Sequence, residues 1–297
     1  ILGKPPDMYD MKTLLTLTVF LFSITLWAQN EGDYHLDKEF DMSPTGTIEL
    51  TSSDAKVTIT GASRKNVHLK VDRTVVTKGL FFGSDDFAIE IDNSNGNLKI
   101  REKSGSSSHG IVGYYNEDYE IKIEAPEGAS ILVKGDDGDY LIKNINGSIV
   151  MGVDNGDIDL LDCKGSKFRF RLDDGNLTMD QGRGAIEIAI DDGDVRIRNG
   201  NFSHVIADID DGDFMIETSL SNTGEYNINA EDGSVSMVVT KGGGQFDVRH
   251  DDARVIAEGA FDVYEKSETF TSLKLANGTA KVNIRADDAR IRLSKPN

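Results

Sequence analysis

"IAIDDGDVRIRNG", residues 188–200, places an acidic turn with one glycine between two short runs in which apolar and polar residues alternate. Similar turns recur along the chain: DDGD at 136, DNGD at 154, DDGN at 173, DDGD at 191, DDGD at 210, EDGS at 231, DDAR at 251 and DDAR at 287. The third residues of successive turns are 18, 19, 18, 19, 21, 20 and 36 residues apart, and the last step is twice 18. A fixed period of this length indicates a repeat architecture.

The flanks of each turn repeat in the same phase. Ile188 and Ile190 precede the turn at Gly193, and Val195 and Ile197 follow it. A period of two on both sides predicts two β-strands, each with one apolar face, that meet at an acidic corner. A second glycine turn closes each unit. Weaker copies lie upstream, around residues 55 and 96.

One unit of about 19 residues cannot bury its apolar face alone, so it must stack on its neighbours. Stacked strands lie about 4.8 Å apart, which predicts that Ile188 lies over Phe170 and under Ala207. We therefore predict an all-β, single-stranded β-solenoid (parallel β-helix) with about 18–21 residues and two short strands per coil. A meander or sandwich of hairpins would also give short alternating strands, but it does not require the same chemistry at every second turn.

Four regions are expected along the chain. Residues 1–28 hold an upstream segment and a signal peptide, in which Lys12 precedes an apolar core of 13 residues at 14–26. That core is short for a membrane span, so cleavage near Ala28 is expected and an uncleaved anchor is the rival interpretation. Residues 29–102 form an N-terminal irregular β-repeat region, 103–118 a Ser/Gly-rich loop, and 119–297 the regular array. Lys266 and Glu268 occupy inward places, which predicts an irregular coil or insertion at 264–275.

Charge and cysteine content narrow the class of protein. The net charge of −19 argues against a nucleic-acid partner, because phosphate binding requires a basic surface. Cys163 is the single cysteine, so no disulfide forms within the chain, and it is expected to be a small half-buried residue rather than a link to another chain. The mature chain is expected to have no membrane span and to be exported to the periplasm, the cell surface or the medium.

The acidic corners have two interpretations. Asp and Asn bond to their own backbone in tight turns, and Gly accepts the positive φ of a sharp corner. Stacked carboxylates also repel one another, so a ladder of them is a candidate site for Ca²⁺. The candidate calcium ligands are Asp136, Asp137, Asp139, Asp154, Asp157, Asp173, Asp174, Asp191, Asp192, Asp194, Asp210, Asp211 and Asp213. No other cofactor is expected, and the G-G-x-G-x-D pattern of calcium-binding nonapeptide repeats is absent.

Catalysis receives little support from the sequence. Glycoside hydrolysis needs two carboxylates whose environments push their pKa values apart, whereas the corners are nearly identical. Five scattered histidines lack ligand spacing: His35, His68, His109, His204 and His250. Of these, His250 falls at an inward place and is expected to be a core residue. No catalytic residue is predicted, and a carbohydrate-active β-helix enzyme remains a third hypothesis.

Residues 119–151, "YEIKIEAPEGASILVKGDDGDYLIKNINGSIVM", resemble the putative-adhesin β-strand-repeat family of bacterial envelope proteins, a domain of unknown function. The resemblance covers about residues 40–293 and implies the fold and a surface role, but no binding residue. We expect an exported, non-enzymatic β-solenoid scaffold that acts as an adhesin or envelope surface protein, with an unknown glycan or protein as its surface ligand. The alternative is a calcium-binding repeat protein.

Overall fold

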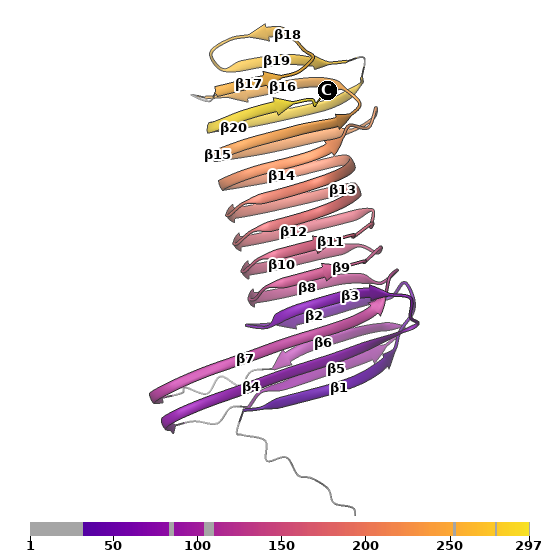
Figure 1. Ribbon diagram of the computed structural model, residues 1–297, viewed down its shortest axis with the longest axis vertical. Coiled ribbons are helices and arrows are strands. Elements are labelled where there is room, and N and C mark those ends of the chain that lie inside the picture. The colour runs from indigo at the N-terminus through magenta and orange to yellow at the C-terminus, as the bar shows by residue number, and fades with distance from the viewer. Residues whose placement is uncertain (1–31, 83–85, 104–109, 252–253, 277, 297) are drawn as a thin grey trace, which may run out of the picture.

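The computed structural model describes residues 32–82, 86–103, 110–251, 254–276 and 278–296. This part of the chain folds into twenty β-strands joined by turns. Figure 1 shows the strands laid across an elongated stack, with the N-terminal strands at one end and the C-terminal strands at the other. Among the described residues there is no helix with the length and apolarity of a membrane span. The all-β, solenoid-like class is confirmed, and the predicted signal peptide lies outside the described residues.

Eight strands build the centre of the stack. They are β8 (Ser130–Asp137), β9 (Tyr140–Lys143), β10 (Ile149–Asn155), β11 (Ile158–Leu161), β12 (Lys167–Asp174), β13 (Leu177–Asp192), β14 (Val195–Ser219) and β15 (Glu225–Lys241). β10 pairs in parallel with β8 and β12, and β11 pairs in parallel with β9 and β13. Ile188 pairs with Phe170 on one side and with Ala207 on the other, as predicted. Equivalent residues of successive units therefore form ladders.

The prediction of two short strands in every coil does not hold along the array. β13, β14 and β15 each continue without a break through a turn at which the sequence predicts one strand to end and the next to begin. β14 alone spans 25 residues. The corners are stacked in register, so their backbones also bond from one rung to the next. Gly138 N donates to Asn155 O at 2.9 Å, and Gly156 N donates to Asp174 O at 3.0 Å. Ladder bonding therefore continues around the corner.

At the C-terminal end the order of rungs differs from the order of the chain. The strands there are β16 (Gly244–His250), β17 (Arg254–Glu258), β18 (Phe261–Lys266), β19 (Phe270–Leu275) and β20 (Ala280–Ser294). β20 lies between β15 on one side and β16 and β17 on the other, in parallel with all three. The expected sequence of corners 231, 251, 287 is therefore wrong, because Asp232 pairs with Asp288.

The predicted irregularity at 264–275 is a hairpin. β18 and β19 pair antiparallel, and β19 also pairs antiparallel with β16. This hairpin covers the last parallel rung and lets the chain turn back, so that β20 can fill the space beside β15. Figure 1 shows β18 and β19 at the C-terminal end of the stack.

The N-terminal end repeats this arrangement. Its strands are β1 (Tyr34–Asp41), β2 (Thr47–Ser52), β3 (Lys56–Ala62), β4 (Asn66–Phe82), β5 (Ala88–Ser94), β6 (Asn97–Lys103) and β7 (Gly110–Pro126). β2 lies between β6 and β8, and β3 lies between β7 and β9, all in parallel. β1 with β4, β4 with β7 and β5 with β6 pair antiparallel. The copy around Gly96 is thus a hairpin turn rather than a coil corner.

The predicted Ser/Gly-rich loop at 103–118 is wrong for its second half. Residues 110–118 belong to β7 and pair with residues 74–82 of β4, from Thr74 with Asp118 to Phe82 with Gly110. The segment after the serine run finds a partner strand, and the two strands project from the stack as a ribbon (Figure 1). Residues 104–109 lie outside the described residues.

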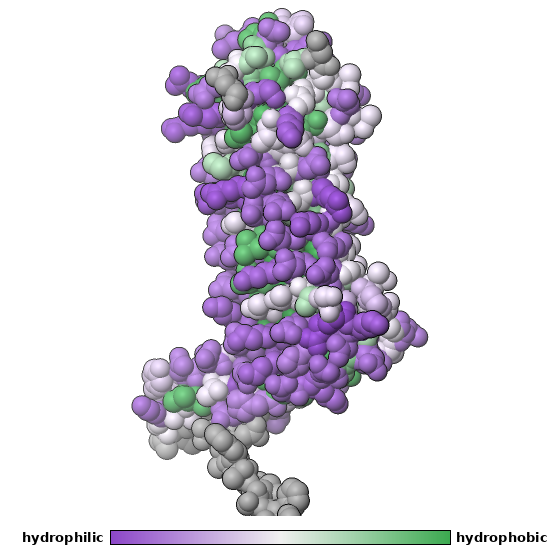
Figure 2. All heavy atoms as spheres, turned by 45° about the vertical axis from the view of Figure 1, so that its right-hand side comes forward, coloured by the Kyte–Doolittle hydropathy of each residue, from purple (hydrophilic) through white to green (hydrophobic). Residues whose placement is uncertain are grey.

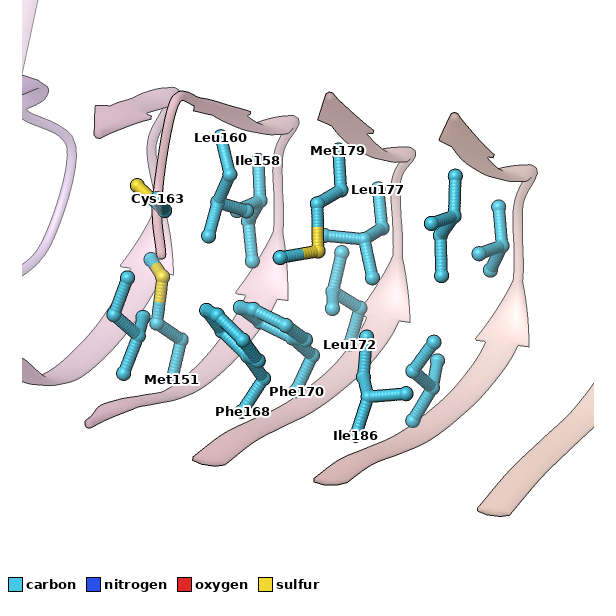
Figure 3. Close-up of a cluster of buried hydrophobic side chains, with 14 of the residues drawn as sticks. Met151, Ile158, Leu160, Cys163, Phe168, Phe170, Leu172, Leu177, Met179 and Ile186 are labelled. Atoms are coloured by element: carbon cyan, nitrogen blue, oxygen red, sulfur yellow. The ribbon is translucent and has the colours of Figure 1, made fainter. Parts of the chain in front are cut away.

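The core is a continuous column of apolar ladders. Figure 3 shows Phe168, Phe170, Leu172 and Ile186 on one wall, facing Ile158, Leu160, Leu177 and Met179 on the other. These side chains are at most 1% exposed. Cys163 is fully buried rather than half-buried, and its Sγ lies 3.6 Å from Ile142 O. Burial of these ladders is the main stabilising contribution available to such narrow coils.

Candidate functional site: the acidic edge

The corners of successive coils form one continuous line, which we call the acidic edge: residues 136–139, 154–157, 173–176, 191–194, 210–213 and 231–234, continued by 287–290. Asp192 pairs with Asp174 on one side and with Asp211 on the other. All thirteen predicted carboxylates lie on this edge and are exposed, except for the half-buried Asp194. Figure 2 shows hydrophilic residues over most of the visible side of the stack. The predicted alignment of the corners is therefore confirmed.

The fourth residue of the corners from 136–139 to 191–194 has a structural role that the repeat did not reveal. Its side-chain oxygen accepts a hydrogen bond from the backbone of the next coil. Asp157 Oδ1 accepts from Asn176 N at 2.9 Å, Asn176 Oδ1 accepts from Asp194 N at 3.0 Å, and Asp194 Oδ1 accepts from Asp213 N at 3.0 Å. The Asp and Asn side chains at this place all supply an oxygen acceptor, but the same residues are typical of ordinary turns, so the repeat alone does not reveal the ladder.

The third residue of the six corners from 136–139 to 231–234 is glycine, whereas it is Ala289 in the corner 287–290. Two reasons for glycine are seen in the central corners. Gly156, Gly175 and Gly193 have φ values of +134°, +136° and +144°, which L side chains rarely adopt. In addition, a Cβ atom at each would come closer than 3.0 Å to the carbonyl oxygen of the corner glycine one rung below. Turn chemistry was expected here. The close approach of stacked backbones is the additional reason.

The calcium ladder stays a prediction. Among the described residues, no group of three or more His, Cys, Asp or Glu side chains is arranged to hold a metal ion. Several of the candidate ligands, such as Asp157, Asp194 and Asp213, already accept hydrogen bonds from their neighbours in the ladder. An ion would have to share these oxygens with the backbone.

The acidic edge continues at its N-terminal end to Asp54, in the corner between β2 and β3. Burial raises the pKa of the Asp54 carboxyl, and the nearby charges of Asp137, Glu117 and Glu102 raise it further. Ser53 N donates to Glu102 Oε2 at 2.9 Å. At this end of the edge, nearby negative charges therefore add to the effect of burial on the pKa of Asp54.

The four histidines that the structure describes lie apart from one another. His35 and His68 lie at the surface beside single carboxylates, Asp72 at 3.1 Å and Asp37 at 2.7 Å. His204 is half-buried, and His109 lies outside the described residues. His250 is half-buried rather than a core residue. A pair of one imidazole and one carboxylate, with no nucleophile positioned beside it, is an ordinary surface ion pair.

Arg73 has a structural role that the repeat pattern does not predict. It is 5% exposed, and its Nε donates to Glu117 Oε1 at 2.6 Å while its Nη1 donates to Gly32 O at 2.7 Å. Its guanidinium lies 4.4 Å from the ring centroid of Phe87. These contacts fix the base of the projecting ribbon formed by β4 and β7.

A family model, Toastrack DUF4097, matches residues 46–294, which is most of the chain and all of the acidic edge. The chain belongs to the Toastrack family. This is a domain of unknown function, and the match confirms the resemblance drawn from residues 119–151. No curated protein is significantly similar to the chain.

Several solved structures are similar to the Toastrack chain. A putative adhesin from Bacteroides fragilis is 13% identical, with a TM-score of 0.43 over 88% of this chain and 97% of that one. A putative adhesin from Parabacteroides distasonis is 11% identical, with a TM-score of 0.44 over 89% and 99%. A putative lipid binding protein from the same species is 13% identical, with a TM-score of 0.36 over 87% and 96%. The family assignment rests on the sequence match alone.

Proposed function

We propose that this Toastrack protein is an exported, non-enzymatic scaffold that acts as an adhesin or cell-envelope surface protein. The observation that carries the proposal is the in-register stack of exposed corners, which presents nearly the same polar group on one coil after another. The scaffold we infer is a parallel β-solenoid in its central part, where β8, β10 and β12 run side by side. The names given to the two adhesin structures agree with this role.

Repetition gives such a surface its binding strength. Equivalent groups on adjacent coils lie about 4.8 Å apart, so a partner that also repeats can make several weak contacts at once. Linked weak contacts can strengthen binding by a factor of about 10² to 10⁴ without any single strong site. A scaffold with a rigid apolar core keeps these contacts in register.

Localisation and attachment test the proposal. A strain that lacks the gene, a complemented strain and a strain with a tagged chain are compared for the position of the protein and for attachment to host mucus or to other cells. We expect the protein outside the cytoplasm and weaker attachment in the deletion strain. Cytoplasmic protein, or attachment unchanged by deletion, would contradict the proposal. Product analysis after incubation with bound glycans separates an adhesin from a carbohydrate-active enzyme.

The alternative is a calcium-binding repeat protein, and the observation behind it is the row of stacked carboxylates at the second corner position, from Asp174 through Asp192 and Asp211 to Asp232. If this row holds Ca²⁺, ligand at 100 times its Kd would stabilise the folded chain by about 2.7 kcal/mol. Chelator-treated protein would then melt about 5–10 °C higher in Ca²⁺ than in Mg²⁺. An unchanged melting temperature at millimolar Ca²⁺ would exclude the alternative.

A further inference from the structure

A cavity of about 750 Å³ lies beside the acidic edge at the C-terminal end of the stack. Arg249 and Asp251 at the end of β16, Arg285 and Asp287 of β20, and Phe270 of β19 contribute to its wall. A second hollow of about 390 Å³ shares Arg285 and Asp287 with it and extends toward β15 and β14. The volume of the first hollow is within the range of about 300–1,000 Å³ that small-ligand sites occupy.

Strand pairing brings the two arginines together. Arg249 pairs with Arg285 in the parallel register of β16 and β20, and it pairs with Phe270 in the antiparallel register of β16 and β19. Paired residues on neighbouring strands lie on the same face and about 4.8 Å apart. The two guanidinium groups therefore stand side by side in the wall of the cavity, with an aromatic ring next to one of them.

Neither guanidinium forms an ion pair with any described residue, whereas Arg169 on the same side of the stack lies 2.6 Å from Glu187 Oε2. Asp251 and Asp287 line the same cavity but form no ion pair with either guanidinium, so the two adjacent positive charges still repel each other. A ligand carboxylate could accept two parallel hydrogen bonds from one guanidinium, or one from each, and would relieve this repulsion. The pair is therefore suited to one anionic group.

The rest of the wall limits which anion fits. Asp251 and Asp287 balance the formal charges of Arg249 and Arg285 in the first hollow, and Asp208, Asp210 and Glu231 make the second hollow acidic, so the site disfavours a densely charged polyanion. Carboxylates accept hydrogen bonds from hydroxyl groups. The wall is thus suited to a ligand that carries one negative charge and several hydroxyls.

An aromatic side chain completes the wall. Phe270 is half-buried, with Arg249 Cζ 5.9 Å from its ring centroid, and it offers an apolar surface for the flat face of a sugar ring.

We propose that this cavity binds an acidic saccharide, a sugar unit that carries one carboxylate and several hydroxyls. Arg249 and Arg285 hold the carboxylate, Asp251 and Asp287 accept hydrogen bonds from ring hydroxyls, and Phe270 packs against the sugar ring. The inference deepens the proposed adhesive role by naming the ligand class of one site on the scaffold, and in this respect it rests on that role.

Calorimetric titration of the purified mature chain tests the site. Galacturonate, a single sugar with one carboxylate, is the probe, and its methyl ester is the matched control, because the ester keeps the ring and hydroxyls but lacks the charge. We expect the acid to bind and the ester to bind at least about tenfold more weakly. Arg249→Gln and Arg285→Gln should each weaken binding of the acid by at least about tenfold. Both residues are exposed, so the melting temperature should not change.

Arg171→Gln is the matched variant, because Arg171 occupies the same outward ladder four coils from Arg285, outside the cavity. The ladder runs from Arg171 through Ala189, Asp208 and Asn229 to Arg285. This variant should bind as the unaltered chain does. Equal binding of acid and ester, equal loss in all three variants, tighter binding of inorganic sulfate than of the saccharide, or no binding at all would each overturn the site. The titration does not depend on attachment, so an unaltered attachment phenotype would count against the adhesive role and not against the site.

Discussion

Replacing one corner glycine by alanine tests the stacking of the corners directly. Gly193 has a φ of +144°, and a Cβ atom there would come closer than 3.0 Å to the carbonyl oxygen of Gly175. Gly152 is the matched control, because it lies in β10, has no positive φ in the disfavoured range, and would place a Cβ atom with nothing within 4 Å. The two substitutions add the same methyl group to the same stack.

The size of the effect follows from two contributions. A non-glycine residue held in a disfavoured backbone region costs about 1–3 kcal/mol. Relieving the overlap also forces neighbouring corners apart, which weakens the bond from Gly193 N to Asp211 O at 2.9 Å and that from Gly175 N to Asp192 O at 3.0 Å, worth about 1 kcal/mol each. Gly193→Ala should therefore lower the free energy of unfolding by about 3–5 kcal/mol. Gly152→Ala should be neutral or stabilise by up to about 1 kcal/mol.

Thermal melting and hydrogen exchange measure the difference. At about 2–4 °C for each kcal/mol, Gly193→Ala should melt about 6–20 °C lower than the unaltered chain. Because repeat arrays can open locally, amide exchange should accelerate first in the corners next to residue 193. If the two variants melt within about 2 °C of each other, the corners do not require glycine for stacking, and the reasoning is refuted.

Three further substitutions or treatments probe other parts of the stack. Asp157→Ala removes the oxygen that accepts a hydrogen bond from Asn176 and should lower the free energy of unfolding by about 1 kcal/mol. Asp157→Asn keeps an acceptor and should lower it by less. Equal unfolding curves for the two variants would mean that the ladder bond contributes nothing. Asp54→Asn should raise the melting temperature at about pH 7 but not at about pH 3. Burial raises the folded-state pKa of Asp54, so the stability that its neutral form provides is complete below the unfolded pKa of 3.8 and is lost as the pH rises through the folded-state value; an equal gain at both pH values would contradict this. Burial also raises the pKa of the Cys163 thiol, so a thiol reagent should react slowly until urea unfolds the chain, and rapid labelling of folded protein would show that the coil opens there.

The centre of the stack could be predicted because each of its coils carries the same information. Alternating apolar residues fix which face is inside, and the corner motif fixes the register, so the neighbours of Ile188 follow from counting. The exposed position of the corner aspartates follows from the same counting. What the period does not reveal is the bonding within the corner, since Asp157 and Asp159 look alike in the sequence, and Asp157 accepts the bonds of the ladder.

The order of the end coils could not be predicted, and the reason is physical. The corners at 251 and 287 have the same four residues, so either could stack on the corner at 231 with equivalent contacts. The hairpin β18–β19 decides the order, because it pairs antiparallel with β16 and leaves the place beside β15 for β20. Long-range pairing of this kind depends on competition between strands rather than on the local pattern. Residues 110–118 illustrate the same limit, since their partner strand lies about 30 residues away in the sequence.

Both ends of the stack cover the open edge of their parallel coils with antiparallel strands. A parallel stack exposes a row of unpaired backbone groups at each end, and such open edges invite association with other strands. Here the coil of β2 and β3 and the coil of β20 are both held between two other coils, and antiparallel hairpins lie outside them. The first and last coils of the repeat are therefore internal, with backbone bonds on both sides, and the strands at the open ends are the irregular ones. This placement explains why the repeat weakens towards both ends of the sequence while the ladders of the centre continue through β2, β3 and β20.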